Sequence, residues 1–143
     1  MEQRRTITRS AFDVLEKARR NAELYQNSYV TPEHVLYQIE SCGLLPNTYE
    51  DNGMSSFFFR ERLGLFLSSL ISAEPPSKNA VKISDNLRFA IEIAIDKAKE
   101  EGGESVGVPH LLFGLACQEN SLAGFLLRKH PEVLQGFGVN SLN

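Results

Sequence analysis

Histidine and cysteine are the side chains with which this 143-residue sequence could build a metal site or a nucleophile. His34 and His110 have no second histidine, cysteine or carboxylate at the H-x-x-x-H or H-E-x-x-H spacing of metal centres. Cys42 and Cys117 stand far apart, without a C-x-x-C spacing. We therefore expect no metal and no catalytic residue, and we interpret both cysteines as buried, reduced thiols. A disulfide, a metal ligand and a Cys-His nucleophile stay open as alternatives.

Glycine-rich phosphate loops are also missing. The pattern G-x-x-x-x-G-K-[ST], which cradles a triphosphate, does not occur. Gly102 and Gly103 follow a helical pattern rather than a strand, so they indicate a helix end and not a dinucleotide-binding loop. The sequence predicts no cofactor and no ATP hydrolysis by this chain alone.

The charge pattern argues against nucleic acid and membranes as partners. Fifteen Lys and Arg against eighteen Asp and Glu give a net charge of −3, although residues 4–20 alone carry +4. No overall basic field would attract nucleic acid. The N-terminal residues lack the apolar segment of a signal peptide, and no stretch has the roughly eighteen apolar residues of a membrane span. We expect a cytoplasmic protein.

The elements that must position these residues come in two copies. Residues 7–39 align without a gap on residues 83–115, at an offset of 76. The aligned pairs fall on apolar and helix-capping positions, which two copies of one helical hairpin should share. They include Ile7 with Ile83, Thr8 with Ser84, Glu16 with Glu92, Ala18 with Ala94, Ala22 with Ala98, Val30 with Val106, His34 with His110 and Leu36 with Leu112.

Each copy is typical of two helices. Thr8 and Ser84 are good N-cap residues, and apolar residues follow at the three- or four-residue spacing of a buried helix face. In the first copy this face is Ala11, Leu15, Ala18, Ala22 and Tyr25. The second helix opens at Thr31-Pro32-Glu33 in copy one and at Val108-Pro109 in copy two. We interpret His34 and His110 as buried imidazoles, bonded to backbone across the axis that relates the copies.

The sequence predicts an all-α fold of about eight helices in two pseudo-symmetric repeats. We expect one domain over residues 1–143, with repeat one at 7–71, a linker at 72–82 and repeat two at 83–136. A further helix from Ser56 carries Phe59, Leu63, Phe66 and Leu70 on one face, and no alternating β-strand pattern occurs.

Two groups of apolar residues are larger than the burial of one helix face in a core requires. The three aromatics at residues 57–59 cannot all face one core, because neighbouring helical residues point about 100° apart. They fit a small satellite core or a partner surface. Phe89, Ile93 and Ile95 replace Asp13, Lys17 and Arg19 of the first copy. Either the second helix lies more centrally, or it offers a groove to a peptide.

The residues that carry these signals resemble the double Clp N-terminal domain of the Hsp100 unfoldases ClpA, ClpB, ClpC and ClpV. The resemblance rests on residues 10–18, on the Thr-Pro-Glu-His-Val-Leu run at 31–36 and on the weaker second copy at 106–115. It covers almost the whole chain. Residues 126–130 look most like the ClpA branch.

The resemblance implies a non-catalytic N-terminal domain that docks protein substrates or an adaptor for an ATP-dependent Clp unfoldase. The ATPase ring is then attached in cis, and the isolated domain is a monomer. Two alternatives stay open. One is a free-standing protein of this fold that binds a Clp ring, and the other is a ClpV-type domain that binds a helix of a secretion-sheath protein.

The candidate binding residues follow from the resemblance and from the apolar excess of the second copy. They are Thr8, Tyr29, Thr31, Glu33, Phe89 and Ile93. In the ClpC branch, paired glutamates hold phosphorylated arginine, but Pro109 stands where the second glutamate would be. We therefore expect an apolar peptide with one basic group, bound with micromolar affinity, and little effect of arginine phosphorylation.

Overall fold

A computed structural model describes residues 6–45, 56–70, 81–103 and 105–135. Its helices are α1 (Arg9–Leu24), α2 (Pro32–Ser41), α4 (Ser56–Ser68), α5 (Asp85–Glu100), α6 (Val108–Ala116), α7 (Leu122–Lys129) and α8 (Glu132–Gln135). Its strands are β1 (Thr6–Ile7), β2 (Tyr29–Val30), β3 (Lys82–Ile83) and β4 (Ser105–Val106). The described residues thus hold six helices of eight residues or more and one four-residue turn of helix, slightly fewer than predicted.

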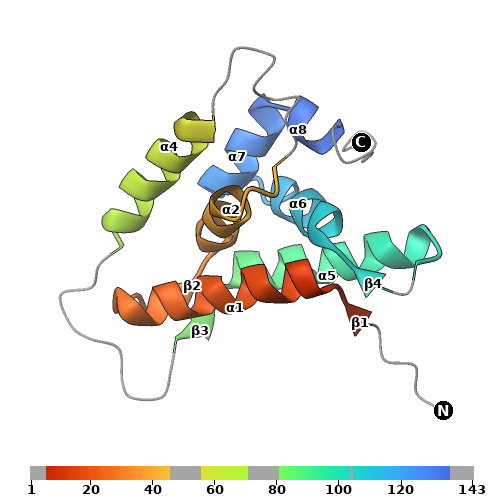
Figure 1. The fold of residues 1–143 in the computed structure, drawn as a ribbon, viewed down its shortest axis with the longest axis horizontal. Helices are drawn as coiled ribbons and strands as arrows, with labels where there is room; N and C mark the ends of the chain where they lie inside the picture. The colour runs from red at the N-terminus through yellow and green to blue at the C-terminus, as the bar shows by residue number, and fades with distance from the viewer. Residues whose placement is uncertain (1–5, 46–55, 71–80, 104, 136–143) are drawn as a thin grey trace.

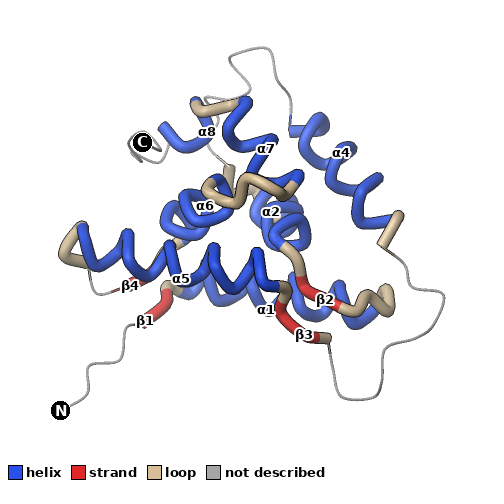
Figure 2. The backbone as a smooth tube through the Cα atoms, turned by 180° about the vertical axis from the view of Figure 1, so that it is seen from behind, coloured by secondary structure: helices blue, strands red, loops and turns tan. Residues whose placement is uncertain are grey.

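The helices form a layered bundle. Helices α1 and α5 lie along the base, α2 and α6 pack above them, and α4, α7 and α8 cover the opposite side (Figures 1 and 2). The core runs through all of these elements, because each contributes apolar side chains at helical spacing. The all-α prediction is confirmed.

The two repeats recur in the structure with the predicted offset. Helices α1 and α5 both have 16 residues, and their bounds differ by 76 positions at each end. Both begin at an N-cap with φ −68° and ψ 158°, whose hydroxyl accepts a hydrogen bond from the third following N–H at 3.2 Å. These caps are Thr8 and Ser84, as predicted, so the pseudo-symmetry is confirmed.

Short parallel strands join each repeat to the other, which the sequence did not predict. β1 pairs with β4, and β2 pairs with β3. The Thr8 N–H donates to the carbonyl of Val106, and the Ser84 N–H to that of Val30, both at 3.0 Å. A strand of two residues is too short to show the period-two pattern of a sheet. Lys82 lies in β3, directly before the predicted start of repeat two at residue 83.

Two expected apolar faces differ in part from the structure. Tyr25 is 57% exposed, because α1 ends at Leu24 and Tyr25 is its C-cap. Phe59 and Leu63 of α4 are fully buried, while Phe66 and Leu70 are half-buried. The side chains of residues 57 and 58 lie outside the described part of the chain.

The end of α1 holds a strained residue. Gln26 has φ 58°, in the left-handed region, where repeat two has Gly102 with φ 74°. This turn lets the Asn27 N–H reach the Ala22 carbonyl at 2.8 Å. A left-handed conformation destabilises the folded protein by about 1–2 kcal/mol when the residue is not glycine. Glycine removes this strain, but it also increases the conformational entropy of the unfolded chain, which lowers the free energy of unfolding by about 0.5–1 kcal/mol. Gln26→Gly is therefore expected to raise the free energy of unfolding by about 0.5–1 kcal/mol in urea denaturation.

The reciprocal variant provides the control. Gly102→Gln is expected to lower the free energy of unfolding by a similar amount, since nothing lies within 4 Å of a Cβ added at Gly102. Two changes of the same sign would contradict this account of the turn.

Candidate functional site

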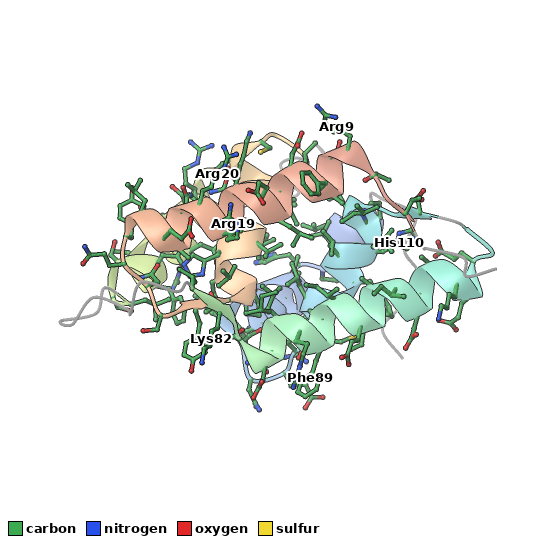
Figure 3. All side chains as sticks on the ribbon, turned by 90° about the horizontal axis from the view of Figure 1, so that it is seen from below. Arg9, Arg19, Arg20, Lys82, Phe89 and His110 are labelled. Carbon is green, nitrogen blue, oxygen red and sulfur yellow. The ribbon has the colours of Figure 1, made fainter. Side chains whose placement is uncertain are left out.

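The six predicted binding residues do not come together at one place. Thr8 lies at the β1–β4 end, where its methyl group would be 3.5 Å from a Cβ added at Gly107, the N-cap of α6. Tyr29 lies at the β2–β3 end, opposite Lys82. Figure 3 shows Arg9, the neighbour of Thr8, and Lys82 at opposite ends of the paired helices. Thr8 therefore meets the second helix of the other repeat, not Thr31.

Thr31 and Glu33 are both engaged within the fold. The hydroxyl of Thr31 lies 2.8 Å from His34 Nδ1 and forms the cap of α2. Glu33 is only 3% exposed, and its Oε2 accepts a hydrogen bond from the Ala123 N–H at 2.9 Å. Ala123 is in the first turn of α7, so this carboxylate satisfies a free helix N–H and complements the helix dipole. Glu33 positions α7 and does not present an open carboxylate.

His34 forms the centre of a hydrogen-bond chain in repeat one. Its Nδ1 accepts from the Thr31 N–H at 2.9 Å, so the proton of the neutral ring is on Nε2. Nε2 donates to Asn27 Oδ1 at 2.9 Å, and Asn27 Nδ2 donates to the Leu70 carbonyl at 3.1 Å. Burial lowers the pKa of His34 to about 4. The imidazole is buried and bonded to backbone as predicted, but its partners are in its own repeat and not across the axis.

His110 repeats the backbone bond with a different second partner. Its Nδ1 accepts from the Gly107 N–H at 2.9 Å, and its Nε2 lies 2.9 Å from Glu101 Oε1. Among the described residues, no group of three His, Cys, Asp or Glu side chains could hold a metal ion. Both histidines thus serve as helix caps.

The two cysteines are free thiols in different environments. Cys117 is partly buried, and burial raises the pKa of its thiol. Cys42 is exposed, contrary to the prediction of a buried thiol, and the Nζ of Lys17 lies 3.7 Å from its Sγ. It follows the last residue of α2, where the chain returns to solvent.

The three apolar residues of α5 that replace charged residues of α1 lie on two sides of the helix. Phe89 is 46% exposed and lies under the Arg88 guanidinium, 5.1 Å from the ring centroid. Ile93 is half-buried one turn before Lys97, whose ammonium lies 4.7 Å from the Phe113 ring centroid of α6. Ile95 packs partly against the core on the other flank, so the excess is partly central packing and partly surface.

Exposed apolar side chains concentrate on the base layer. We call the exposed surface of α1, α5 and the four strands the basal face. Seven of the nine large hydrophobic residues that are exposed in the described part of the chain belong to α1, to its C-terminal cap, to α5 or to the strands. They are Ile7, Phe12, Leu24, Tyr25, Tyr29, Ile83 and Phe89. Clustered exposed apolar residues are typical of protein interaction surfaces.

Tyr29 and Phe89 of this face were predicted from the sequence, whereas the other five residues were not. Phe12 is 51% exposed and lies one position after buried Ala11, so a comparison with the helical stripe could have indicated it. Ile7 and Ile83 were noted only as a matched pair, and both are exposed. Their exposure depends on the strands, which the sequence did not reveal.

The basic residues of α1 are largely paired with carboxylates on the same helix. Arg19 contacts both Glu16 and Glu23, and Arg20 Nε lies 3.6 Å from Glu16 Oε1. The hydrogen bond from Arg19 lowers the pKa of Glu16. The predicted basic helix therefore presents a mixed charge pattern, with Arg9 largely exposed at its start (Figure 3).

A pocket opens on the side of the base layer, between α1, α2 and α4. It has a volume of about 340 Å³. Its lining residues are Asn21, Tyr25, Asn27, His34, Tyr37, Gly64, Leu67 and Ser68. No pattern along the chain indicates this pocket, since three separate helices form its walls. Across the described residues, no helix is long and apolar enough to cross a membrane.

Comparisons with known proteins agree with this fold. A family model described as the Clp repeat (R) N-terminal domain matches residues 6–130. No curated protein sequence matches the chain. Three similar solved structures share the fold at low identity.

The first of these is the Hsp104 N-terminal domain from Candida albicans, with a TM-score of 0.77 and 16% identity over 96% of this chain and 95% of that one. The N-terminal domain of the ClpV1 ATPase from the E. coli Sci1 T6SS has a TM-score of 0.70 and 20% identity, covering 92% and 82% of the two chains. The N-terminal domain of the chaperone ClpD from Arabidopsis thaliana has a TM-score of 0.63 and 17% identity, covering 98% and 89%.

Proposed function

Because the chain belongs to the Clp repeat N-terminal domain family, we propose that it is a non-catalytic docking module that receives polypeptides for an ATP-dependent Clp unfoldase. The polypeptide is a substrate or an adaptor protein. The ATPase modules lie in cis, beyond the residues of this chain, and the isolated domain is a monomer. A cytoplasmic location belongs to the same proposal, since an exposed thiol such as Cys42 stays reduced there.

The observation that carries this proposal is the concentration of exposed apolar side chains on the basal face. Tyr29 and Phe89 offer aromatic contacts, being 51% and 46% exposed. Aromatic side chains contribute large contact areas at protein interfaces. Ile93 and Thr8 extend the surface, while Thr31 and Glu33 hold the helices that support it. A polypeptide with spaced apolar residues is the complementary ligand.

The basal face also suits weak, reversible binding. The pocket between α1, α2 and α4 opens at the edge of this face and shares Tyr25 with it, so a docked chain makes most of its contacts with the surface outside this pocket. We expect a dissociation constant in the micromolar range, which lets a delivery module release its cargo. Since Glu33 is buried and Pro109 replaces its counterpart, arginine phosphorylation of the polypeptide is expected to change affinity little.

A second candidate, a ClpV-type domain that binds a helix of a secretion-sheath protein, draws support from the structural likeness to ClpV1. A third is a free-standing protein of this fold that binds a Clp ring. A nucleotide-binding motif downstream in the same reading frame favours the unfoldase, and preference for helical over extended peptides favours the ClpV type.

Titration of a fluorescein-labelled, permanently unfolded polypeptide with the 143-residue chain tests the docking proposal. Fluorescence anisotropy should give a micromolar dissociation constant for the wild type. The double variant Tyr29→Ala/Phe89→Ala is expected to bind about tenfold more weakly or worse, because two aromatic contacts worth about 1 kcal/mol each are lost.

A matched control uses two exposed apolar residues outside the basal face. Leu65 on α4 and Phe125 on α7 are 68% and 50% exposed. The double variant Leu65→Ala/Phe125→Ala should bind within about twofold of the wild type if only the basal face docks the polypeptide. Glu33→Gln should likewise bind the polypeptide within about twofold of the wild type. Equal losses in both double variants, or no loss in the basal one, would refute docking at this face.

A further inference from the structure

The pocket between α1, α2 and α4 is lined entirely by uncharged groups. None of its eight lining residues is Asp, Glu, Lys or Arg. His34, its one titratable imidazole, is neutral at physiological pH, since its Nδ1 is committed to the Thr31 N–H and its pKa is about 4. A charged ligand entering this pocket would lose hydration without gaining a counter-charge, which is costly. The lining therefore favours an uncharged ligand.

Several polar groups of the pocket have unused hydrogen-bonding capacity. The side-chain amide of Asn21 and the hydroxyls of Tyr25 and Tyr37 make no hydrogen bond to any other described residue. The amide both donates and accepts, and so does each hydroxyl. The two tyrosine rings also provide flat apolar surface. A planar ligand with both a donor and an acceptor would satisfy these groups.

Packing contacts fix the third wall of the pocket. Phe59 and Leu63 of α4 are fully buried in the shared core. Arg60 of α4 holds the buried Glu40 of α2, with Nη2 lying 3.1 Å from Oε1 and Nε donating to Oε2 at 3.2 Å. The pocket is thus built by a rigid junction of helices.

The lining residues from α1 and α2 differ from those at the equivalent positions of repeat two. The positions of Asn21 and Tyr37 are taken by Lys97 and Phe113, which stack on each other. The position of Tyr25 is taken by Glu101, which pairs with His110. Charged and stacked side chains therefore stand at these positions in repeat two, where repeat one has uncharged polar groups.

The packing of the helices explains this difference. Gly114 allows α6 to lie directly against Ala90 of α5, whereas the corresponding residues of repeat one are the larger Gln38 and Val14. Helices α1 and α2 accordingly pack less closely than α5 and α6. The uncharged lining is thus particular to the first repeat.

We propose that this pocket binds the primary carboxamide of a glutamine or asparagine side chain, presented by a polypeptide docked on the adjacent basal face. The carboxamide is planar and uncharged, and it both donates and accepts hydrogen bonds. A volume of about 340 Å³ accommodates such a side chain with part of its backbone. That the carboxamide belongs to a docked polypeptide rests on the proposed function, whereas the preference of the pocket for a carboxamide does not.

The test uses a small probe and the whole chain. N-acetylglutamine methylamide is titrated into ¹⁵N-labelled protein, with N-acetylglutamate methylamide as its charged isostere at pH 7. For a probe of about 14 non-hydrogen atoms we expect a dissociation constant of about 1 mM. The shifted amide signals should be those of α1, α2 and α4 around the pocket, and the glutamate probe should bind about tenfold more weakly or not at all.

Variants separate recognition from folding. Tyr37→Phe keeps the ring and removes the hydroxyl, so it should weaken the glutamine probe about fivefold. Asn21→Ala should have a similar effect. It should leave the fold intact, because the Asn21 side chain makes no hydrogen bond to another described residue. Ser41→Ala removes an exposed hydroxyl at the end of α2, outside both the pocket and the basal face, and should leave the probe affinity within about twofold of wild type.

Specific outcomes would overturn this inference. Equal affinity for the two probes, shifts centred elsewhere, or an unchanged affinity in both Tyr37→Phe and Asn21→Ala would each refute it, and so would a nucleoside binding more tightly than the glutamine probe. Probe binding with no docking of unfolded polypeptide would instead refute the proposed function and leave the pocket assignment intact. Docking without probe binding would refute the pocket alone.

Discussion

Gly114→Ala is expected to lower the free energy of unfolding by about 3 kcal/mol or more. A Cβ added at Gly114 would lie 2.1 Å from the carbonyl oxygen of Ala90 and 2.9 Å from its carbonyl carbon. Both contacts are to the backbone of α5, which cannot rotate away as a flexible side chain could. Helix α6 would have to move off α5 and disturb the core shared by both repeats. Thermal unfolding should show a fall in Tm of about 10 °C.

The same substitution in another helix provides the control. Gly64 lies within α4, and a Cβ there would meet nothing within 4 Å. Gly64→Ala should raise the free energy of unfolding by about 0.5–1 kcal/mol, since alanine is the better helix former. If the two variants had similar stability, the close approach of α5 and α6 would not be the tight contact described above.

Acidification is expected to remove about 3 kcal/mol of stability through His34 alone. Burial lowers the pKa of this imidazole from 6.5 to about 4. Between these two values the unfolded chain takes up a proton that the folded protein cannot accept, so stability falls as the pH falls. Above pH 6.5 the contribution is fully present, and at pH 5 about 2 kcal/mol should be lost. Protonation of Nδ1 would also break its bond to the Thr31 N–H.

The variant His34→Gln separates this effect from the titration of carboxylates. Glutamine at this position can still accept from the Thr31 N–H, as in a Thr-x-x-Gln capping box, but it does not titrate. The variant should be less stable than the wild type at pH 7, because the bond to Asn27 is altered. The difference should shrink by about 2 kcal/mol between pH 7 and pH 5 in urea denaturation. A constant difference over this range would show that His34 is not the titrating group.

The sequence alone determined the helices and their duplication, because the signals for both are local. Thr8 and Ser84 cap their helices through an N–H only three residues away. His34 and His110 likewise bind an N–H three residues before them. Contacts of this kind depend on residue type and spacing, and both can be read along the chain.

Partners that are distant in sequence were decided only by the tertiary structure. Glu33 was predicted as a peptide-binding residue, but packing of α7 against α2 places the Ala123 N–H, 90 residues away, at 2.9 Å from its carboxylate. The two-residue strands bring Ile7 and Ile83 to the surface by pairing with the opposite repeat. No local pattern indicates which segment will supply such a partner.

The pocket of repeat one shows the same distinction at the level of packing. Asn21, Tyr37 and Ser68 come from three helices, and they line one space only because α4 docks on α2. Whether that space stays open depends on how closely neighbouring helices approach. A single position, Gly114 in one repeat and Gln38 in the other, changes that approach. The spacing of hydrophobic residues specifies which face of a helix is buried. The fit between two buried faces determines where the protein can hold a ligand, because a difference as small as one methyl group changes how closely two helices pack.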